Sequence, residues 1–243
     1  MARLAHLLVL LLAAGCASTG VEAPPTAPPA TAGPSLAVHW VRDSAEHHAA
    51  LVQAYALAGE RVGELAAERE AGTWAVALDA DETVISNSLF QKELEVSGGR
   101  FSQERWQAWA RRREATALPG ARAFLERVHD LGGRIVIVTN RDEAICPDTE
   151  ANFRDLGLPY DAMLCRRGES RKEPRWEQVV SGTAVPGLPP LEIVMWLGDN
   201  IQDFPDLGQD LRFEPDAAFA DFGRKYVVIP NPMYGSWTSN PAN

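Results

Sequence analysis

Three short, mostly apolar runs each end within two residues of a polar side chain. They occupy residues 74–78, 135–138 and 191–197, and the polar residues that follow them include Asp79, Thr139 and Asp199. Apolar runs of this length are typical of strands buried in a parallel sheet. Because the carboxyl ends of parallel strands form one crevice, we expect these polar residues to lie close together.

The segments between these runs carry apolar residues at helical spacing. Helices are predicted over residues 43–70, 86–113, 119–131 and 143–156, and further strands over residues 161–165 and 226–229. Strands alternating with helices predict an α/β fold with a doubly wound parallel sheet. Residues 36–72 and 86–118 are assigned to a helical accessory or cap region, and residues 73–85 and 119–243 to the α/β core.

The N-terminal residues have the pattern of an export signal. One positive charge precedes an apolar run over residues 4–14, which is too short for an ordinary membrane span. The sequence Ala-Ala-Gly-Cys that ends at Cys16 resembles a bacterial lipobox, in which the cysteine is acylated. We therefore expect residues 1–15 to be a lipoprotein signal peptide and Cys16 to be lipidated. A plain secretory signal cut near Ala17 is the alternative.

Residues 16–35 follow as a segment rich in proline, alanine and threonine. Such a segment has too few bulky apolar groups to form a core and predicts an extended tether. Residues 36–243 then form a single folded domain. An aspartate after the lipidated cysteine would favour the inner membrane, and its absence favours the outer membrane. We expect a lipid-anchored protein of the bacterial cell envelope that faces the periplasm or the cell surface.

The charge of the chain limits its partners. It has 23 basic and 33 acidic residues, a formal net charge of −10. A strongly acidic surface repels polyanions, so a nucleic acid polymer is not expected as a partner.

Two cysteines, Cys146 and Cys165, remain after the signal. In an oxidising compartment they can pair, and otherwise they remain as buried free thiols.

Two carboxylates stand two residues apart directly after the first strand. Asp79 can attack phosphorus as a nucleophile, and Asp81 can serve as the general acid and base. After the second strand, the hydroxyl of Thr139 and the backbone near Asn140 can hold phosphate oxygens without adding charge. Each pair alone is a weak signal.

A cation and a second acidic pair complete the set. Lys172 can offset the repulsion between a phosphoryl group and the acids, with Arg171 and Arg175 as neighbouring alternatives. Asp199 and Asp203 supply the hard oxygen ligands that Mg²⁺ prefers.

The order DxDxT, Thr, Lys and GDxxxD resembles the haloacid dehalogenase (HAD) superfamily over about residues 74–204. The resemblance implies a Mg²⁺-dependent phosphotransferase core. In it, Asp79 is the nucleophile, Asp81 the general acid and base, and Thr139 and Lys172 hold the phosphoryl group. The metal ligands that it implies are Asp79, the backbone carbonyl of Asp81, and Asp199, with Asp203 in support.

A narrower resemblance covers nearly the whole mature chain. The segments LDADETVISNS, LPGA, VTNRDE, KEPR, GDNIQDF and PNPMYGSW, with the pair Trp106 and Trp109, are similar to the class C acid phosphatases. These are the lipoprotein e family of 5′-nucleotidases. The resemblance implies that the nucleobase is held between two aromatic rings, here Trp106 and Tyr234. Asn140, which follows the second strand, is also expected to bind substrate. One of the two tryptophans is expected to pack in the core instead.

We therefore predict an extracytoplasmic, Mg²⁺-dependent phosphomonoesterase that hydrolyses nucleoside 5′-monophosphates, or nicotinamide mononucleotide, through an aspartyl-phosphate. A broad-specificity acid phosphatase and a surface ligand-binding lipoprotein on the same fold are the alternatives. The expected partners are a small-molecule phosphomonoester and, through the lipid anchor, a membrane. A homodimer is left open beside a monomer.

Overall fold

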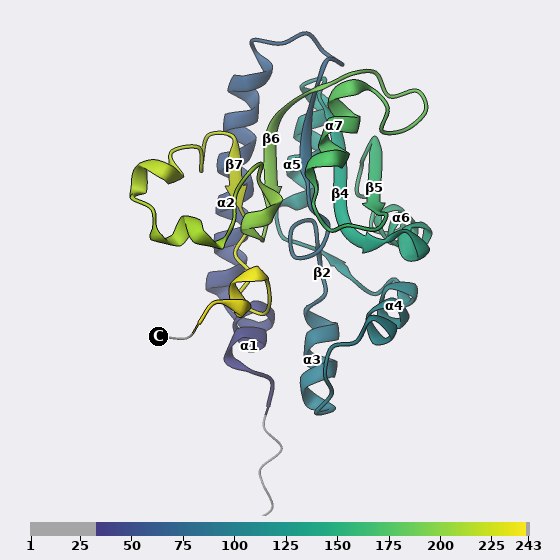
Figure 1. The fold of residues 1–243 in the computed structure, drawn as a ribbon, viewed down its shortest axis with the longest axis vertical. Coiled ribbons are helices and arrows are strands. Elements are labelled where there is room, and N and C mark those ends of the chain that lie inside the picture. The colour runs from purple at the N-terminus through teal and green to yellow at the C-terminus, as the bar shows by residue number, and fades with distance from the viewer. Residues whose placement is uncertain (1–32, 242–243) are drawn as a thin grey trace, which may run out of the picture. The chain divides into compact units, whose positions relative to one another are not determined.

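A parallel sheet of five strands forms the centre of the fold (Figure 1). The computed structural model describes residues 33–241, so the predicted signal peptide, Cys16 and most of the tether lie outside the described residues. The strand order is β5-β4-β1-β6-β7. The strands are β1 (Trp74–Leu78), β4 (Arg134–Asp142), β5 (Ala162–Arg166), β6 (Glu192–Gly198) and β7 (Tyr226–Val228). The predicted α/β class with a parallel sheet is confirmed.

The connections between the strands are mostly helical. The α-helices are α1 (Leu36–Asp43), α2 (Ala45–Ala66), α3 (Ser88–Val96), α4 (Gln103–Arg112), α5 (Ala121–Asp130), α6 (Cys146–Asp155) and α7 (Glu173–Ser181). A two-stranded hairpin pairs β2 (Ile85–Ser86) with β3 (Thr116–Ala117). Short 3₁₀ helices lie at η1 (Glu143–Ile145), η2 (Ile201–Asp203), η3 (Gln209–Phe213), η4 (Asp216–Phe219) and η5 (Ser236–Ser239).

The two faces of the sheet bury different side chains. On β1, Trp74, Val76 and Leu78 belong to one apolar cluster, which α2, α5 and α6 also fill. The intervening Ala75 and Ala77 belong to a second cluster with residues of α7. Because successive side chains of a strand point to opposite faces, helices cover the sheet on both sides. This is the doubly wound arrangement that the sequence predicts.

Two predicted boundaries are wrong. The helix predicted over residues 86–113 is two helices, α3 and α4, because the chain turns at Gly98, where φ is +62°. The second strand is longer than residues 135–138, since β4 continues until Asp142 pairs with Arg166 of β5. Thr139 therefore lies inside this strand.

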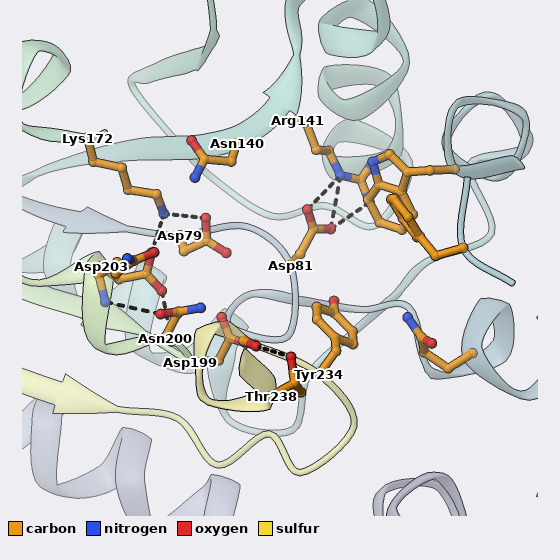
Figure 2. A pocket seen from close by; sticks show the side chains of 15 residues that line it. Asp79, Asp81, Asn140, Arg141, Lys172, Asp199, Asn200, Asp203, Tyr234 and Thr238 are labelled. Atoms are coloured by element: carbon orange, nitrogen blue, oxygen red, sulfur yellow. Dashed lines mark hydrogen bonds and ion pairs between the residues drawn. The ribbon is translucent and has the colours of Figure 1, made fainter. Parts of the chain in front are cut away.

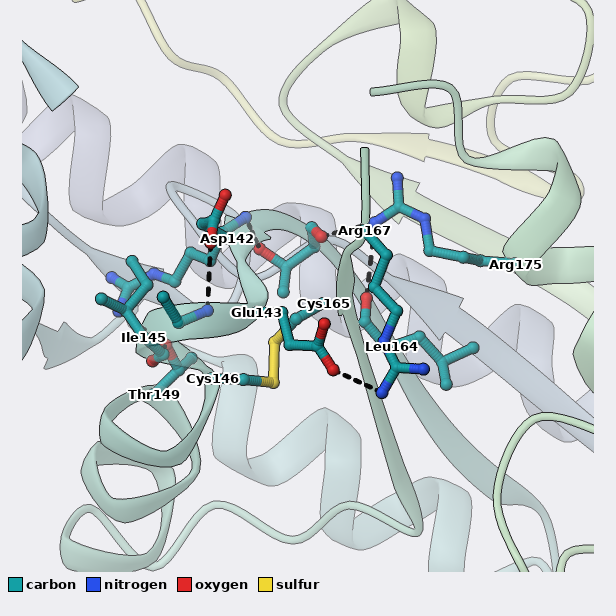
Figure 3. Close-up of a disulfide and its surroundings, with 12 residues drawn as sticks. Asp142, Glu143, Ile145, Cys146, Thr149, Leu164, Cys165, Arg167 and Arg175 are labelled. Carbon is teal, nitrogen blue, oxygen red and sulfur yellow. Dashed lines mark hydrogen bonds and ion pairs between the residues drawn. A yellow bond between two sulfur atoms is a disulfide. The ribbon is translucent and has the colours of Figure 1, made fainter. Parts of the chain in front are cut away.

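A disulfide joins Cys146 at the start of α6 to Cys165 on β5, which decides between the two states left open above (Figure 3). The bond links the first turn of α6 directly to the sheet.

Within residues 33–241, no helix has both the length and the apolar character that crossing a membrane requires.

Candidate active site

Three buried or half-buried aspartates meet at the carboxyl end of the sheet. Asp79 follows β1, while Asp199 and Asp203 follow β6, and one carboxylate oxygen of each lies within 4.8 Å of the others (Figure 2). The pKa of Asp199 lies well above its ordinary value, because burial raises it most and the charges of Asp203 and Asp79 raise it further. Burial likewise raises the pKa of Asp79 to about 7. Carboxylates this close together repel one another when ionised. A divalent cation that prefers oxygen ligands would offset this repulsion.

Lys172 supplies one cation to this cluster. Its ammonium Nζ lies 2.5 Å from Asp79 Oδ1 and 2.6 Å from Asp203 Oδ1, and its side chain is only 2% exposed. Burial alone would lower the pKa of Lys172, but the two carboxylates raise it. Lys172 immediately precedes α7, so the start of that helix fixes its position. The neighbouring Arg171 is exposed and pairs with Glu173 instead.

The turn after β6 places Asp203 against the end of the strand. A Cβ on Gly198 would come within 2.2 Å of the Asp203 Cβ, so only glycine allows this approach. Asp203 Oδ2 accepts a hydrogen bond from the backbone N–H of Asn200 at 3.0 Å. Asp199 accepts one from Asn231 Nδ2 at 2.8 Å. These contacts hold both acids in place.

Asp81 points away from the acidic cluster toward Arg141 (Figure 2). Arg141 donates to Asp81 Oδ1 from Nε at 3.0 Å and from a terminal nitrogen at 2.8 Å. Asn87 Nδ2 donates to the same oxygen at 2.7 Å, and Asn87 Oδ1 accepts from Arg141 and from Trp109 Nε1. Arg141 and Asn87 are both buried. Neither residue was predicted from the sequence, although Arg141 lies in the segment VTNRDE and Asn87 in LDADETVISNS.

A cleft of about 490 Å³ opens over these residues. Its walls include acids, Lys172, the amide of Asn140 and three aromatic rings, Phe101, Trp106 and Tyr234. Trp109 is buried and hydrogen-bonded to Asn87, so it is the tryptophan of the pair that packs in the core. Phe101, which is 60% exposed, was not predicted, because an aromatic residue in a loop carries no periodic signal.

Thr139 does not line the cleft. Its side chain is fully buried, and its hydroxyl accepts the backbone N–H of Arg141 at 3.1 Å. Asn140, the next residue, does line it, and its Oδ1 accepts a hydrogen bond from Arg175 at 2.7 Å. The structure thus brings together Asp79, Asp81, Asn140, Lys172, Asp199, Asp203, Trp106 and Tyr234 around one cleft.

Comparison with known proteins identifies the family of this chain. The family described as "HAD superfamily, subfamily IIIB (Acid phosphatase)" matches residues 9–237. The chain belongs to this family. It is thus an acid phosphatase, an enzyme that hydrolyses phosphomonoesters.

Solved structures of class C acid phosphatase from Bacillus anthracis are similar to this acid phosphatase over most of their length. One matches with a TM-score of 0.73 and 30% identity, covering 83% of this chain and 84% of that chain. A second, crystallised with tungstate bound, matches with the same TM-score and coverage at 31% identity. HAD phosphatases typically use a divalent metal, and the three clustered aspartates form an acidic group that could hold one.

Proposed function

We propose that this acid phosphatase hydrolyses nucleoside 5′-monophosphates, or nicotinamide mononucleotide, with Mg²⁺ as its metal. One observation carries the proposal: a single cleft is lined both by the acids with Lys172 and by aromatic rings. A phosphoryl group requires the acids with their cation, and a flat base favours the rings, because aromatic rings stack on any base. The relative crystallised with tungstate, a tetrahedral oxyanion like phosphate, supports an oxyanion site in this family.

The proposed reaction has two steps. In the first, a carboxylate oxygen of Asp79 attacks phosphorus while the ester bond breaks, and Asp81 gives its proton to the departing oxygen. In the second, Asp81 takes a proton from water, the water oxygen attacks phosphorus, and the bond to Asp79 breaks, which releases phosphate. Lys172 balances the negative charge of the phosphoryl oxygens.

Asp79, Asp199 and the backbone carbonyl of Asp81 would hold Mg²⁺, and Asp203 would orient the site. When bound, the ion supplies positive charge that stabilises the developing charge on the phosphoryl oxygens. Asp203 already accepts from Lys172 and from the backbone of Asn200, which suits a supporting role. The role of Thr139 in holding phosphate stays a prediction, and its buried hydroxyl favours the backbone and Asn140 for that task.

Phosphate release by residues 36–243 tests this proposal. The substrates are AMP, nicotinamide mononucleotide, glucose 6-phosphate and an aryl phosphate, each with Mg²⁺ and with EDTA. Metal-dependent turnover that favours the two nucleotides supports it. Turnover without a nucleotide preference indicates a broad-specificity phosphatase. The variant Trp106→Ala should raise KM for AMP more than KM for glucose 6-phosphate. Trp109→Phe, which alters the neighbouring ring in the core, is the variant for comparison.

We further propose that the enzyme works outside the cytoplasm, anchored by a lipid on Cys16. The lipobox and the proline-rich segment after it support this location. Labelling of the full chain in bacteria with a radioactive fatty acid tests the anchor. Cys16→Ser should abolish the label and release the enzyme from the membrane fraction, while Cys146→Ser should keep the label.

A further inference from the structure

Glu82 combines two unfavourable features. Its carboxylate is buried, only 4% exposed, and its backbone φ is +53°, in the left-handed region that residues with a Cβ rarely adopt. A buried carboxylate is costly unless hydrogen bonds satisfy it, and strained backbone persists where the surroundings demand it. The side chain does not line the cleft, so its contribution lies in the neighbours that it holds.

The carboxylate of Glu82 accepts hydrogen bonds from Asn87, which is close in sequence, and from Tyr234, which is distant in sequence. Oε1 accepts the backbone N–H of Asn87 at 2.6 Å, and Oε2 accepts from Asn87 Nδ2 at 3.2 Å. The remaining contact is the hydroxyl of Tyr234, which donates to Oε2 across 152 residues of sequence. Tyr234 lines the cleft, so Glu82 anchors one of its aromatic walls to the turn after β1.

We propose that Glu82 is a specificity-determining positioning residue. Its carboxylate fixes the ring of Tyr234 and thereby favours phosphomonoesters whose leaving group carries a flat ring over aliphatic ones. A ring held in place before binding loses less conformational freedom when the ligand arrives, which strengthens binding. This inference rests on the proposed function, because it takes Tyr234 to contact the nucleobase.

The position of Glu82 explains why such an anchor is useful. Asp79, Asp81 and Glu82 lie within four consecutive residues, so one turn sets the phosphoryl site and the ring relative to each other. Asn87 braces the turn, since its Nδ2 donates both to Asp81 and to Glu82. A change at Glu82 can therefore also disturb Asp81, and the test must separate binding from chemistry.

Steady-state kinetics of Glu82→Gln, Tyr234→Phe and the double variant, with Mg²⁺, make this separation. The substrates are AMP and glycerol 3-phosphate, which has no ring. Each single change should raise KM for AMP about three- to ten-fold, the usual worth of one hydrogen bond, with a smaller effect on glycerol 3-phosphate. The double variant should be no worse than either single one, because both remove the same contact. Tyr160→Phe is the control: it removes a phenol hydroxyl from a residue that does not line the cleft, so it should leave the ratio of the two KM values unchanged.

Several results would overturn the inference. A folded Glu82→Gln that lowers kcat equally for both substrates would show that it acts through Asp81 or the fold. Additive effects in the double variant would show that the two residues act separately. If Glu82→Gln does not fold, an unchanged KM for AMP in Tyr234→Phe decides against the inference. If the unaltered enzyme itself has no preference for AMP, the proposed function fails, and this inference falls with it.

Discussion

The ammonium Nζ of Lys172 lies 2.5 Å from Oδ1 of Asp79 and forms a buried ion pair with it. The two residues are 93 positions apart in sequence, and each follows or precedes an element of the α/β core. The pair places a cation beside the oxygen of the proposed nucleophile, where a phosphoryl group would bring further negative charge. Its geometry is the most direct sign that the cleft is built for an anionic substrate.

Replacing Lys172 with methionine should lower kcat/KM for AMP by about 10²- to 10³-fold, the usual cost of removing one charge-stabilising group. The buried carboxylates of Asp79 and Asp203 would lose their cation, and the phosphoryl oxygens would lose theirs. Steady-state kinetics at saturating Mg²⁺ measures the effect. Arg171→Met is the matched control, since Arg171 is exposed and pairs with Glu173. A loss below about three-fold in Lys172→Met would contradict the assignment.

The acidic cluster should make the metal-free protein less stable as pH rises. Burial, partly offset by Lys172 and reinforced by Asp203 and Asp81, raises the pKa of Asp79 from 3.8 to about 7. A raised pKa means that the folded state holds the proton more tightly, so the contribution to stability is present at low pH. It is lost as pH rises through about 7.

Urea unfolding in EDTA checks this prediction by comparison with Asp79→Asn, because acids elsewhere titrate too. As pH rises from 4 to 7, the free energy of unfolding of the variant should increase relative to that of the unaltered protein by on the order of a few kcal/mol. Mg²⁺ should reduce this gain, since a bound cation stabilises the charged carboxylates. A difference that stays constant with pH, or that is the same with Mg²⁺ and with EDTA, would contradict the prediction.

Two of the site residues that were predicted from sequence, Asp79 and Asp199, come just after the ends of strands. Asp79 and Asp199 follow mostly apolar runs that are typical of buried strands, so their place at the carboxyl edge follows from the topology of a parallel sheet. Lys172 has no such signal, and its assignment depended on the resemblance to the HAD superfamily.

Residues that depend on long-range contacts could not be predicted in the same way. Arg141 contacts Asp81 across 60 residues, and Tyr234 contacts Glu82 across 152. The pattern of neighbouring residues in the sequence predicts neither of these two contacts. The extension of β4 past Thr139 depends similarly on pairing with β5, which turned an expected loop hydroxyl into a buried one. By contrast, the break between α3 and α4 was visible in the pair Gly98 and Gly99, a stop signal that the apolar spacing obscured.

The disulfide between Cys146 and Cys165 should contribute about 2–4 kcal/mol to the free energy of unfolding, as expected for a closed loop of this length. It spans 19 positions of sequence and joins α6 to β5. The double variant Cys146→Ser/Cys165→Ser should unfold at a lower urea concentration, and the unaltered protein in reductant should behave like it. A reductant effect on the double variant itself would point to a cause other than this bond.

Arg141 should influence the departure of the leaving group more than substrate binding. Its guanidinium is 1% exposed and holds Asp81, the proposed general acid, through hydrogen bonds from two of its nitrogens. Acid assistance matters most for a poor leaving group, because a good one departs without a proton. We therefore expect Arg141→Met to lower kcat for AMP by about 10²-fold, within the usual range for general acid catalysis, and kcat for 4-nitrophenyl phosphate by much less.

The comparison with Asp81→Asn decides whether Arg141 acts through Asp81. Asp81→Asn should give the same unequal loss, and the double variant should add little to it, because the two residues act as one unit. Thermal unfolding of each variant shows whether the fold survives the loss of a buried guanidinium. If Arg141→Met is folded yet slows both substrates equally, Arg141 supports the phosphoryl site rather than the proton transfer.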